Sequence, residues 1–370
     1  MSCLMAATSR IRPEPPITTG RPSSSSPPHS MHVLKRLANL PEEEPAMKHL
    51  SKLLSAGLLA ATAAGSAMAQ QYPTKTITFA SAMAAGSSTD ILARETAKFL
   101  TDRMSQSVIV EVVAGAGGNI AAQKVVNATP DGYTLLFVTN GVISNQAMRS
   151  KPPFDVTKDL VIISPLFEGI FGLFINPNVP AKTVNELIAY ARANPGKLNY
   201  GTSGIGGIVH LVNADFAERA KISLVHVPYK GGAEYMPATI ANQVQMNFAD
   251  VSFAKPQVDA GKVRALAVSS KQRLASMPDV PTFEESGPAF AGYTPTFWMG
   301  LYAPKGTPQA AIDRLNAEVR AFVTPPDAKA RYAARGYQTV WLPPAEAQKR
   351  VSDELAQFNK TIDTVKIERH

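Results

Sequence analysis

Residues 76–104, TITFASAMAAGSSTDILARETAKFLTDRM, decide the fold class of this 370-residue chain. The stretch opens with a short β-rich run at 76–80 and continues through a loop of small residues. It ends in a segment, 90–104, whose apolar residues recur at helical spacing. A strand followed so closely by an amphipathic helix is the first half of a strand–helix–strand unit. The stretch therefore predicts an α/β protein.

The same alternation continues toward the C-terminus. Further strands are predicted at 108–113, 133–138, 198–200, 224–227, 244–248 and 263–268, and further helices at 120–127 and 183–194. Thr183 and Glu186 form a capping box at the start of the last helix. Such alternation implies parallel sheets with crossover helices, and these sheets bind ligands at the carboxyl ends of their strands.

The loop after the first strand, residues 84–90, is a candidate anion site. Its small residues let a ligand approach the backbone, and the free amides of the following helix attract negative charge. Helix capping is the alternative, because Thr89 or Asp90 as the N-cap residue would alone account for either side chain.

Two other loops raise the question of cofactors and catalysis. Residues 114–119, AGAGGN, lack the spacing and the acidic partner of a dinucleotide site, so no cofactor is expected. Ser203, His210 and Asp250 could form a hydrolase triad, but Ser203 lacks a Gly-x-Ser-x-Gly elbow. His210 is better explained as a helix-start residue bonded to a neighbouring loop. No metal-ligand spacing occurs, so no metal is expected.

The N-terminal part has the order of a secretory signal. A basic start at 47–52 precedes an apolar run at 53–64 and the small-residue site Ala67-Met68-Ala69. A buried core helix is the alternative, but the run shows no amphipathic pattern. We therefore expect 1–46 to be a mis-annotated upstream extension, 47–69 a cleaved signal peptide, and the mature protein a periplasmic one.

Composition narrows the function further. Residues 1–69 hold seven Lys or Arg and four Asp or Glu, so the net charge falls from +8 to +5 when they are removed. No block of Lys and Arg interleaved with aromatic residues occurs, so nucleic acid is not an expected partner. The sole cysteine, Cys3, lies in the upstream extension, which excludes disulfide and thiolate chemistry in the mature chain. We expect a monomer.

A series of motifs resembles one family. In order they are Tyr72-Pro73, AGSSTD at 85–90, GAGGN at 115–119, PDGYTLL at 130–136, NPGKLNYG at 194–201, HVPYKG at 226–231, AGKVRALAV at 260–268, PDVPT at 278–282 and APKGTP at 303–308. Each motif is weak, but together and in this order they resemble the Bug-type receptors, the extracytoplasmic solute-binding proteins of tripartite tricarboxylate transporters.

The resemblance implies a type II periplasmic-binding-protein fold with two α/β domains and a ligand cleft between them. We expect domain 1 at 70–170 and 300–370 and domain 2 at 171–299. In the family, a carboxylate is held by the loop after the first strand and by a Gly/Ser/Thr loop. By position, the expected ligand-binding residues are Ala84, Ala85, Ser87, Ser88, Thr89, Asp90, Thr202, Ser203, Gly204, Ile205, Gly206, His210 and Asp250.

The sequence departs from the family at the expected pocket. Ser87 stands where a second glycine is usual, and Met83 where a Phe is common. Ile205 replaces a frequent Asn, and Ala249 separates Phe248 from Asp250. Most of these changes remove polarity or add apolar bulk. They predict a ligand less polar than citrate, such as an aromatic or branched acid.

The expected function is therefore capture of a small carboxylate, either an organic acid, an amino acid or an aromatic acid, for uptake through membrane transporter subunits. A receptor that reports to a sensor kinase is the alternative, and the sequence does not separate the two. A secreted hydrolase is disfavoured, so we expect no enzymatic activity.

Overall fold

The computed structural model describes residues 72–365 and 367–369. The predicted upstream extension at 1–46 and the predicted signal peptide at 47–69 lie outside these residues, so both stay predictions. Among the described residues, no helix has the length and apolar character needed to cross a membrane.

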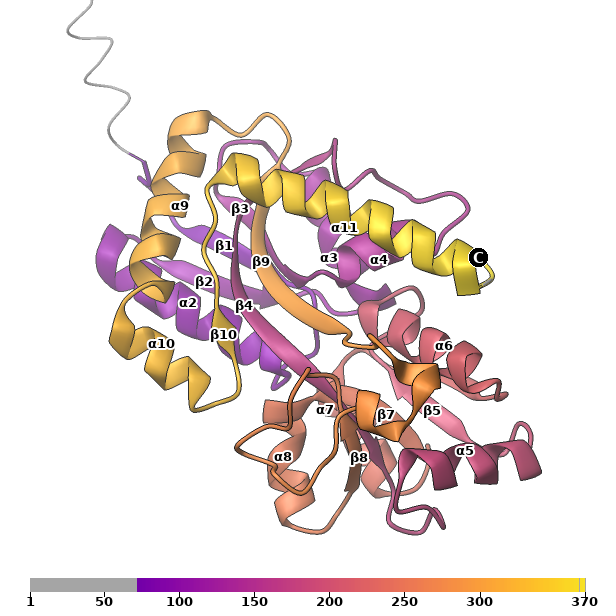
Figure 1. Ribbon diagram of the computed structural model, residues 1–370. Helices are drawn as coiled ribbons and strands as arrows, with labels where there is room; N and C mark the ends of the chain where they lie inside the picture. Colours follow the sequence, from indigo (N-terminus) through magenta and orange to yellow (C-terminus); the bar gives the residue numbers. More distant parts are fainter. Residues whose placement is uncertain (1–71, 366, 370) are drawn as a thin grey trace, which may run out of the picture. The chain divides into compact units, whose positions relative to one another are not determined.

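The described residues alternate between strands and helices (Figure 1). The strands are β1 Ile77–Ser81, β2 Val108–Val112, β3 Thr134–Thr139, β4 Leu160–Ile175, β5 Asn199–Thr202, β6 Val225–Pro228, β7 Met246–Asp250, β8 Arg264–Val268, β9 Thr296–Pro304 and β10 Gln338–Thr339. The helices are α2 Ser88–Met104, α3 Asn119–Val126, α4 Gly141–Ala147, α5 Val184–Ala193, α6 Ile208–Ala220, α7 Gly232–Ile240, α8 Val251–Asp259, α9 Gln309–Val323, α10 Pro326–Ala333 and α11 Pro344–Val365.

The strands form a sheet with the order β2-β1-β3-β9-β4-β7-β5-β6, and β8 and β10 also pair with β4. Pairing of β1 with β2 and β3, and of β5 with β6 and β7, is parallel, as the alternation predicted. The two longest strands, β4 and β9, run antiparallel to their neighbours. The expectation of parallel sheets alone is therefore wrong, because it missed these two strands.

Strand β4 joins two groups of strands. Its first part, as far as Ile170, pairs with β9, whereas Phe171–Ile175 pairs with β7. Its register shifts on both sides of Pro165, which lacks the N–H that a regular ladder needs. We call residues 72–170 and 296–365 the first lobe, and residues 171–295 the second lobe. The expected domain edges at 170 and 299 stay predictions.

Helix α2 shows why the opening stretch folds as it does. Leu92, Thr96, Leu100 and Met104 recur every four residues and are all buried, so one face of the helix packs on the sheet. The Ser87 side chain accepts a hydrogen bond from the Asp90 amide. Ser87 is therefore the N-cap residue, and the prediction that Thr89 or Asp90 fills this position is wrong.

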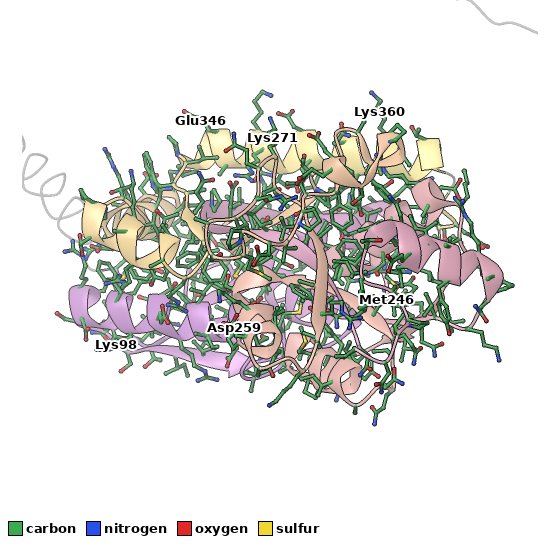
Figure 2. All side chains as sticks on the ribbon, turned by 60° about the horizontal axis from the view of Figure 1, so that its bottom comes forward. Lys98, Met246, Asp259, Lys271, Glu346 and Lys360 are labelled. Atoms are coloured by element: carbon green, nitrogen blue, oxygen red, sulfur yellow. The ribbon has the colours of Figure 1, made fainter. Side chains whose placement is uncertain are left out.

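Buried apolar side chains separate the helices from the sheet, while charged side chains lie outside. Met246 is fully buried in β7, whereas Lys271, Glu346 and Lys360 project from the surface (Figure 2). Helix α5 begins as predicted, because Thr183 accepts a hydrogen bond from the Glu186 amide at 3.1 Å. The Glu186 carboxylate reaches back to the amide of Lys182, one residue before the expected partner.

Candidate functional site

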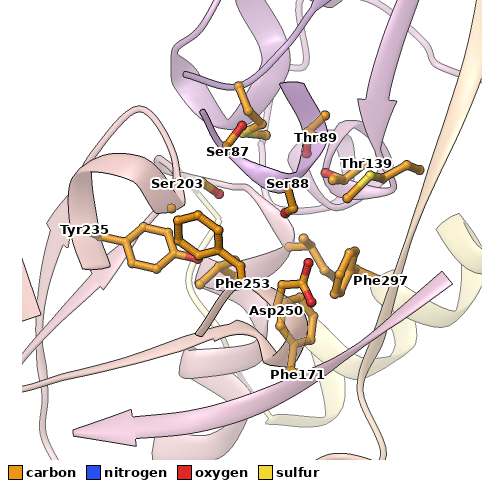
Figure 3. A pocket seen from close by; sticks show the side chains of 15 residues that line it. Ser87, Ser88, Thr89, Thr139, Phe171, Ser203, Tyr235, Asp250, Phe253 and Phe297 are labelled. Carbon is orange, nitrogen blue, oxygen red and sulfur yellow. The ribbon is translucent and has the colours of Figure 1, made fainter. Parts of the chain in front are cut away.

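A small cavity lies where the two lobes meet (Figure 3). Its volume is about 50 Å³, a few times the ~10–15 Å³ that one water molecule requires. The lining comes from both lobes: Met83, Ser87, Ser88, Thr89, Thr139, Phe297 and Met299 from the first, and Phe171, Ser203, Ile208, Val209, Gly232, Tyr235, Asp250 and Phe253 from the second. Both lobes therefore line the cavity, which is partly open to the outside.

Three helices present their N-termini to this cavity. The first residues of α2, α6 and α7 all line it: Ser88, Ile208 and Gly232. The first amides of a helix have no partner within the helix, and its dipole places positive potential at that end. Each such end stabilises an anion by about 0.3–1 kcal/mol, and by up to ~2 kcal/mol where it is partly buried. The cavity therefore suits a carboxylate.

The loop at 84–90 is held in place by its own polar groups. The Asp90 carboxylate accepts hydrogen bonds from the Gly86 amide at 3.0 Å and from Arg94 Nε at 3.1 Å. The Ala84 amide donates to the Lys230 carbonyl of the second lobe at 3.2 Å. These contacts leave Ser87, Ser88 and Thr89 at the cavity, while Asp90 and Ala84 fix the shape of the loop.

The loop at 202–207 is held by two histidines. Thr202 Oγ1 lies 2.6 Å from His226 Nε2, and His210 Nδ1 accepts a hydrogen bond from the Gly206 amide at 3.1 Å. The two imidazole rings stack with their centroids 4.0 Å apart, and Tyr200 stacks on His226 at 5.0 Å. The rings therefore position the loop that carries Ser203. This contact of His210 fits its interpretation as a helix-start residue bonded to a neighbouring loop.

Two glycines let the lobes approach closely beside the cavity. Gly204 has a φ of +125°, and a Cβ there would lie 2.4 Å from the Gly117 amide nitrogen. Gly117 belongs to the 114–119 loop, whose sequence lacks the spacing and the acidic partner of a dinucleotide site. Ser144 Oγ also donates to the Gly206 carbonyl at 2.9 Å. The glycines thus permit backbone contact between the lobes.

Asp250 ends β7 and caps α8. Its Oδ1 accepts hydrogen bonds from the Ser252 amide at 2.9 Å and the Ser252 hydroxyl at 2.8 Å, and Oδ2 accepts one from the Tyr337 hydroxyl of the first lobe. Burial raises the pKa of Asp250, and the hydrogen bonds from Tyr337 and Ser252 oppose that rise. Asp250 is therefore a buried acid that bridges the lobes.

An apolar wall, which the sequence did not reveal, completes the cavity. It consists of Phe171 and Phe297, whose ring centroids lie 4.8 Å apart, together with Phe253, Tyr235 and Met299. Phe171 comes from β4, Phe297 from β9 and Phe253 from α8. Nothing in their local sequence distinguishes them from core residues, although Met83, which was singled out, lies in the same lining.

The sequence-predicted residues fall into two groups. Those that line the cavity are Ser87, Ser88, Thr89, Ser203 and Asp250. Those that surround it without belonging to the described lining are Ala84, Ala85, Asp90, Thr202, Gly204, Ile205, Gly206 and His210. Ile205 is 43 % exposed. Their roles in ligand binding stay predictions. Within residues 72–365 and 367–369, no group of His, Cys, Asp and Glu could hold a metal.

Comparison with known proteins agrees with this arrangement. Residues 92–367 match the tripartite tricarboxylate transporter family receptor. A UPF0065 protein from the gbd 5′ region of Cupriavidus necator is 39 % identical over 268 residues, which are 70 % of this chain and 80 % of the relative.

Two solved structures share the fold. Rpa4515 of R. palustris with adipate has a TM-score of 0.76 and 29 % identity, covering 80 % of this chain and 99 % of that chain. MatC (Rpa3494) of Rhodopseudomonas palustris with bound malate has a TM-score of 0.75 and 27 % identity, covering 79 % of this chain and 100 % of that chain. The expected two-domain α/β fold and the family resemblance are confirmed: the chain belongs to the solute-binding receptors of the tripartite tricarboxylate transporter family.

Proposed function

We propose that this protein captures a small carboxylate in the cavity between its lobes and delivers it to the membrane subunits of a tripartite tricarboxylate transporter. The convergence of the α2, α6 and α7 N-termini carries this proposal. Among the described residues that line the cavity, none is Lys, Arg or His. The anion would therefore be held by backbone amides and hydroxyls, which supply directional hydrogen bonds without a fixed counter-charge.

The ligand would be less polar than a tricarboxylate. Two relatives are seen with adipate and with malate, so a carboxylate ligand has precedent in the family. In this chain, Phe171, Phe253, Phe297 and Met299 face the same cavity as the helix ends. Apolar surface of this kind gains about 25 cal/mol per Å² when a ligand covers it. This supports an acid with an aromatic or branched body.

Binding would stabilise closure of the lobes. Polar contacts that cross the cleft include Ala84 to Lys230, Ser144 to Gly206 and Tyr337 to Asp250. An open form would break them and expose the helix ends, and a ligand that bonds to both lobes would favour the closed form. We infer that the transporter recognises this closed form, in the periplasm, after the signal at 47–69 has been removed. We infer that the receptor acts by binding, without turnover.

A thermal-shift and calorimetry screen tests the proposal. Mono-, di- and tricarboxylates, amino acids and neutral compounds are added to the purified protein. A carboxylate should raise the melting temperature, because it binds only the native state, and Ser203→Trp should abolish the shift by filling the cavity. Ser352→Trp, on an exposed position of α11, is the matched control. A shift with neutral compounds alone would contradict the proposal.

A further inference from the structure

Asp250 is the only charged side chain in the described lining of the cavity. It is 6 % exposed, and the hydrogen-bond partners of its carboxylate, Tyr337 and Ser252, are neutral. Figure 3 shows the carboxylate beside the Phe297 ring and facing Ser88. Because charges interact strongly in a buried site, this acid decides which charge a ligand can carry near it.

The rings around Asp250 favour the same sign of charge. Phe297, Phe171 and Phe253 lie next to it in the cavity (Figure 3). The faces of aromatic rings carry partial negative charge and attract cations by about 0.5–2 kcal/mol. An acid surrounded by aromatic rings is therefore suited to an ammonium group, and a second carboxylate at the same place would meet repulsion.

The position of Asp250 fixes where the ammonium would be on the ligand. Ser88 is the first residue of α2, where the ligand carboxylate is proposed to bind, and its side chain faces Asp250 in the same cavity lining (Figure 3). The positive and negative parts of the site are thus neighbours. A ligand that satisfies both needs its ammonium close to its carboxylate, with its apolar body directed toward the Phe and Met wall.

We propose that the ligand is an α-amino acid with an apolar side chain, and that Asp250 selects it by binding the α-ammonium group. This inference rests on the proposed function, because it assumes that a carboxylate occupies the helix ends.

The test compares ligands that differ in one group on the same carbon. Titration calorimetry at neutral pH is run with L-phenylalanine, with 2-methyl-3-phenylpropanoate, which has a methyl in place of the ammonium, and with benzylmalonate, which has a second carboxylate there. L-leucine, 2,4-dimethylpentanoate and isobutylmalonate form a second series. One of the amino acids should bind at least about tenfold more tightly than its methyl analogue, the smallest factor that close charge pairs contribute. The malonate should bind most weakly.

Asp250→Asn should remove the preference. Asn caps helices as well as Asp does, so α8 should keep its start, and the amino acid should lose about tenfold in affinity while the methyl analogue changes little. Asp215→Asn is the matched control: Asp215 is also a buried acid with a raised pKa, but it pairs with Arg219 and lies outside the described lining. That variant should leave the ranking of ligands unchanged.

The outcomes separate this inference from the proposed function. If the methyl analogue or the malonate binds the wild-type protein as tightly as the amino acid, the inference is overturned, whereas carboxylate binding stands. The inference is also overturned, and carboxylate binding again stands, if Asp250→Asn folds and still prefers the amino acid to its methyl analogue. The same conclusion follows if the only acids that bind lie outside the two series. If no carboxylate binds at all, both fall. If Asp250→Asn fails to fold, the order of affinities of the wild-type protein for the amino acid, its methyl analogue and the malonate still tests the inference.

Discussion

The hydroxyl of Tyr337, in the first lobe, donates a hydrogen bond to Asp250 Oδ2, in the second. This bond crosses the cleft and can form only when the lobes are closed. Burial of the pair raises the pKa of Tyr337 well above its ordinary value, and the nearby Asp250 charge adds to that rise. The phenol therefore stays protonated and available as a donor.

Removing this donor should weaken ligand binding. A hydrogen bond to a charged group contributes about 1.5–3 kcal/mol, and Tyr337→Phe loses it only in the closed form. We expect the affinity for the carboxylate that binds most tightly to fall at least about tenfold, measured by calorimetry. Tyr332→Phe is the control, because the Tyr332 hydroxyl bonds to Glu95 within the first lobe, at 3.0 Å. Equal affinities of the two variants would contradict a role in closure.

A methyl group at Gly204 should keep the lobes apart. Because its Cβ would lie 2.4 Å from the Gly117 nitrogen, Gly204→Ala should reduce ligand affinity by about five- to a hundredfold, since overpacking costs about 1–3 kcal/mol. It should also enlarge the radius of gyration measured with ligand by small-angle scattering. Gly287→Ala is the matched control: its φ is +123°, and nothing lies within 4 Å of the added atom. Both variants carry the same backbone strain, so similar melting temperatures with different affinities would identify the contact as the cause.

The affinity for an amino acid should depend on the charge of Asp250. An ammonium ligand prefers the ionised carboxylate, so L-phenylalanine should bind fully above the pKa of Asp250 and progressively less as the pH falls through it. Burial places this pKa above the usual 3.8, which moves the loss to a higher pH than an ordinary aspartate gives. The titratable groups facing Asp250 are the phenols of Tyr337 and Tyr235, both with raised pKa values. In Asp250→Asn this loss should be absent.

Acid should weaken the second lobe at a defined ion pair. Arg273 donates from Nε and Nη2 to Glu285, whose Oε2 also accepts from the Thr282 amide at 2.7 Å. The Arg273 hydrogen bonds are the main reason that the pKa of Glu285 falls from 4.5 to about 2. Its stabilising effect is therefore present above pH 4.5 and lost as the pH falls to about 2. Glu285→Gln should lower the melting temperature at pH 7 but not near pH 2, and 1 M salt should shrink the difference.

Much of the fold could be predicted because strands and helices alternate with clear periodicity. Strands β4 and β9 were missed for a physical reason. Both lie in the middle of the sheet and are buried on both faces, so their residues show no alternation of polar and apolar types. The sequence of β4 also contains Pro165, Gly169 and Gly172, and such residues are more typical of irregular segments than of strands.

The polar part of the candidate site was predictable and the apolar part was not. Small and hydroxyl residues after a strand, such as Ser87 and Ser203, have few roles other than turns, caps and ligand contacts. Phe171, Phe253 and Phe297 are distant in sequence, and an apolar residue that lines a cavity has the same local signature as one in the core. The antiparallel pairing of β4 and β9 brings Phe171 and Phe297 together, and Phe253 reaches the same cavity from α8.

The pairing of Ile170 with Thr296 in the β4–β9 ladder has a consequence for engineering. These residues belong to the first lobe and flank the second lobe on either side, and they face each other across adjacent antiparallel strands. Residues 171–295 thus form an exchangeable cassette whose entry and exit coincide, so the corresponding segment of a relative could replace it without moving the termini of the host. Such a chimera would exchange half of the binding pocket while changing the sheet at only one pair of neighbouring strand positions.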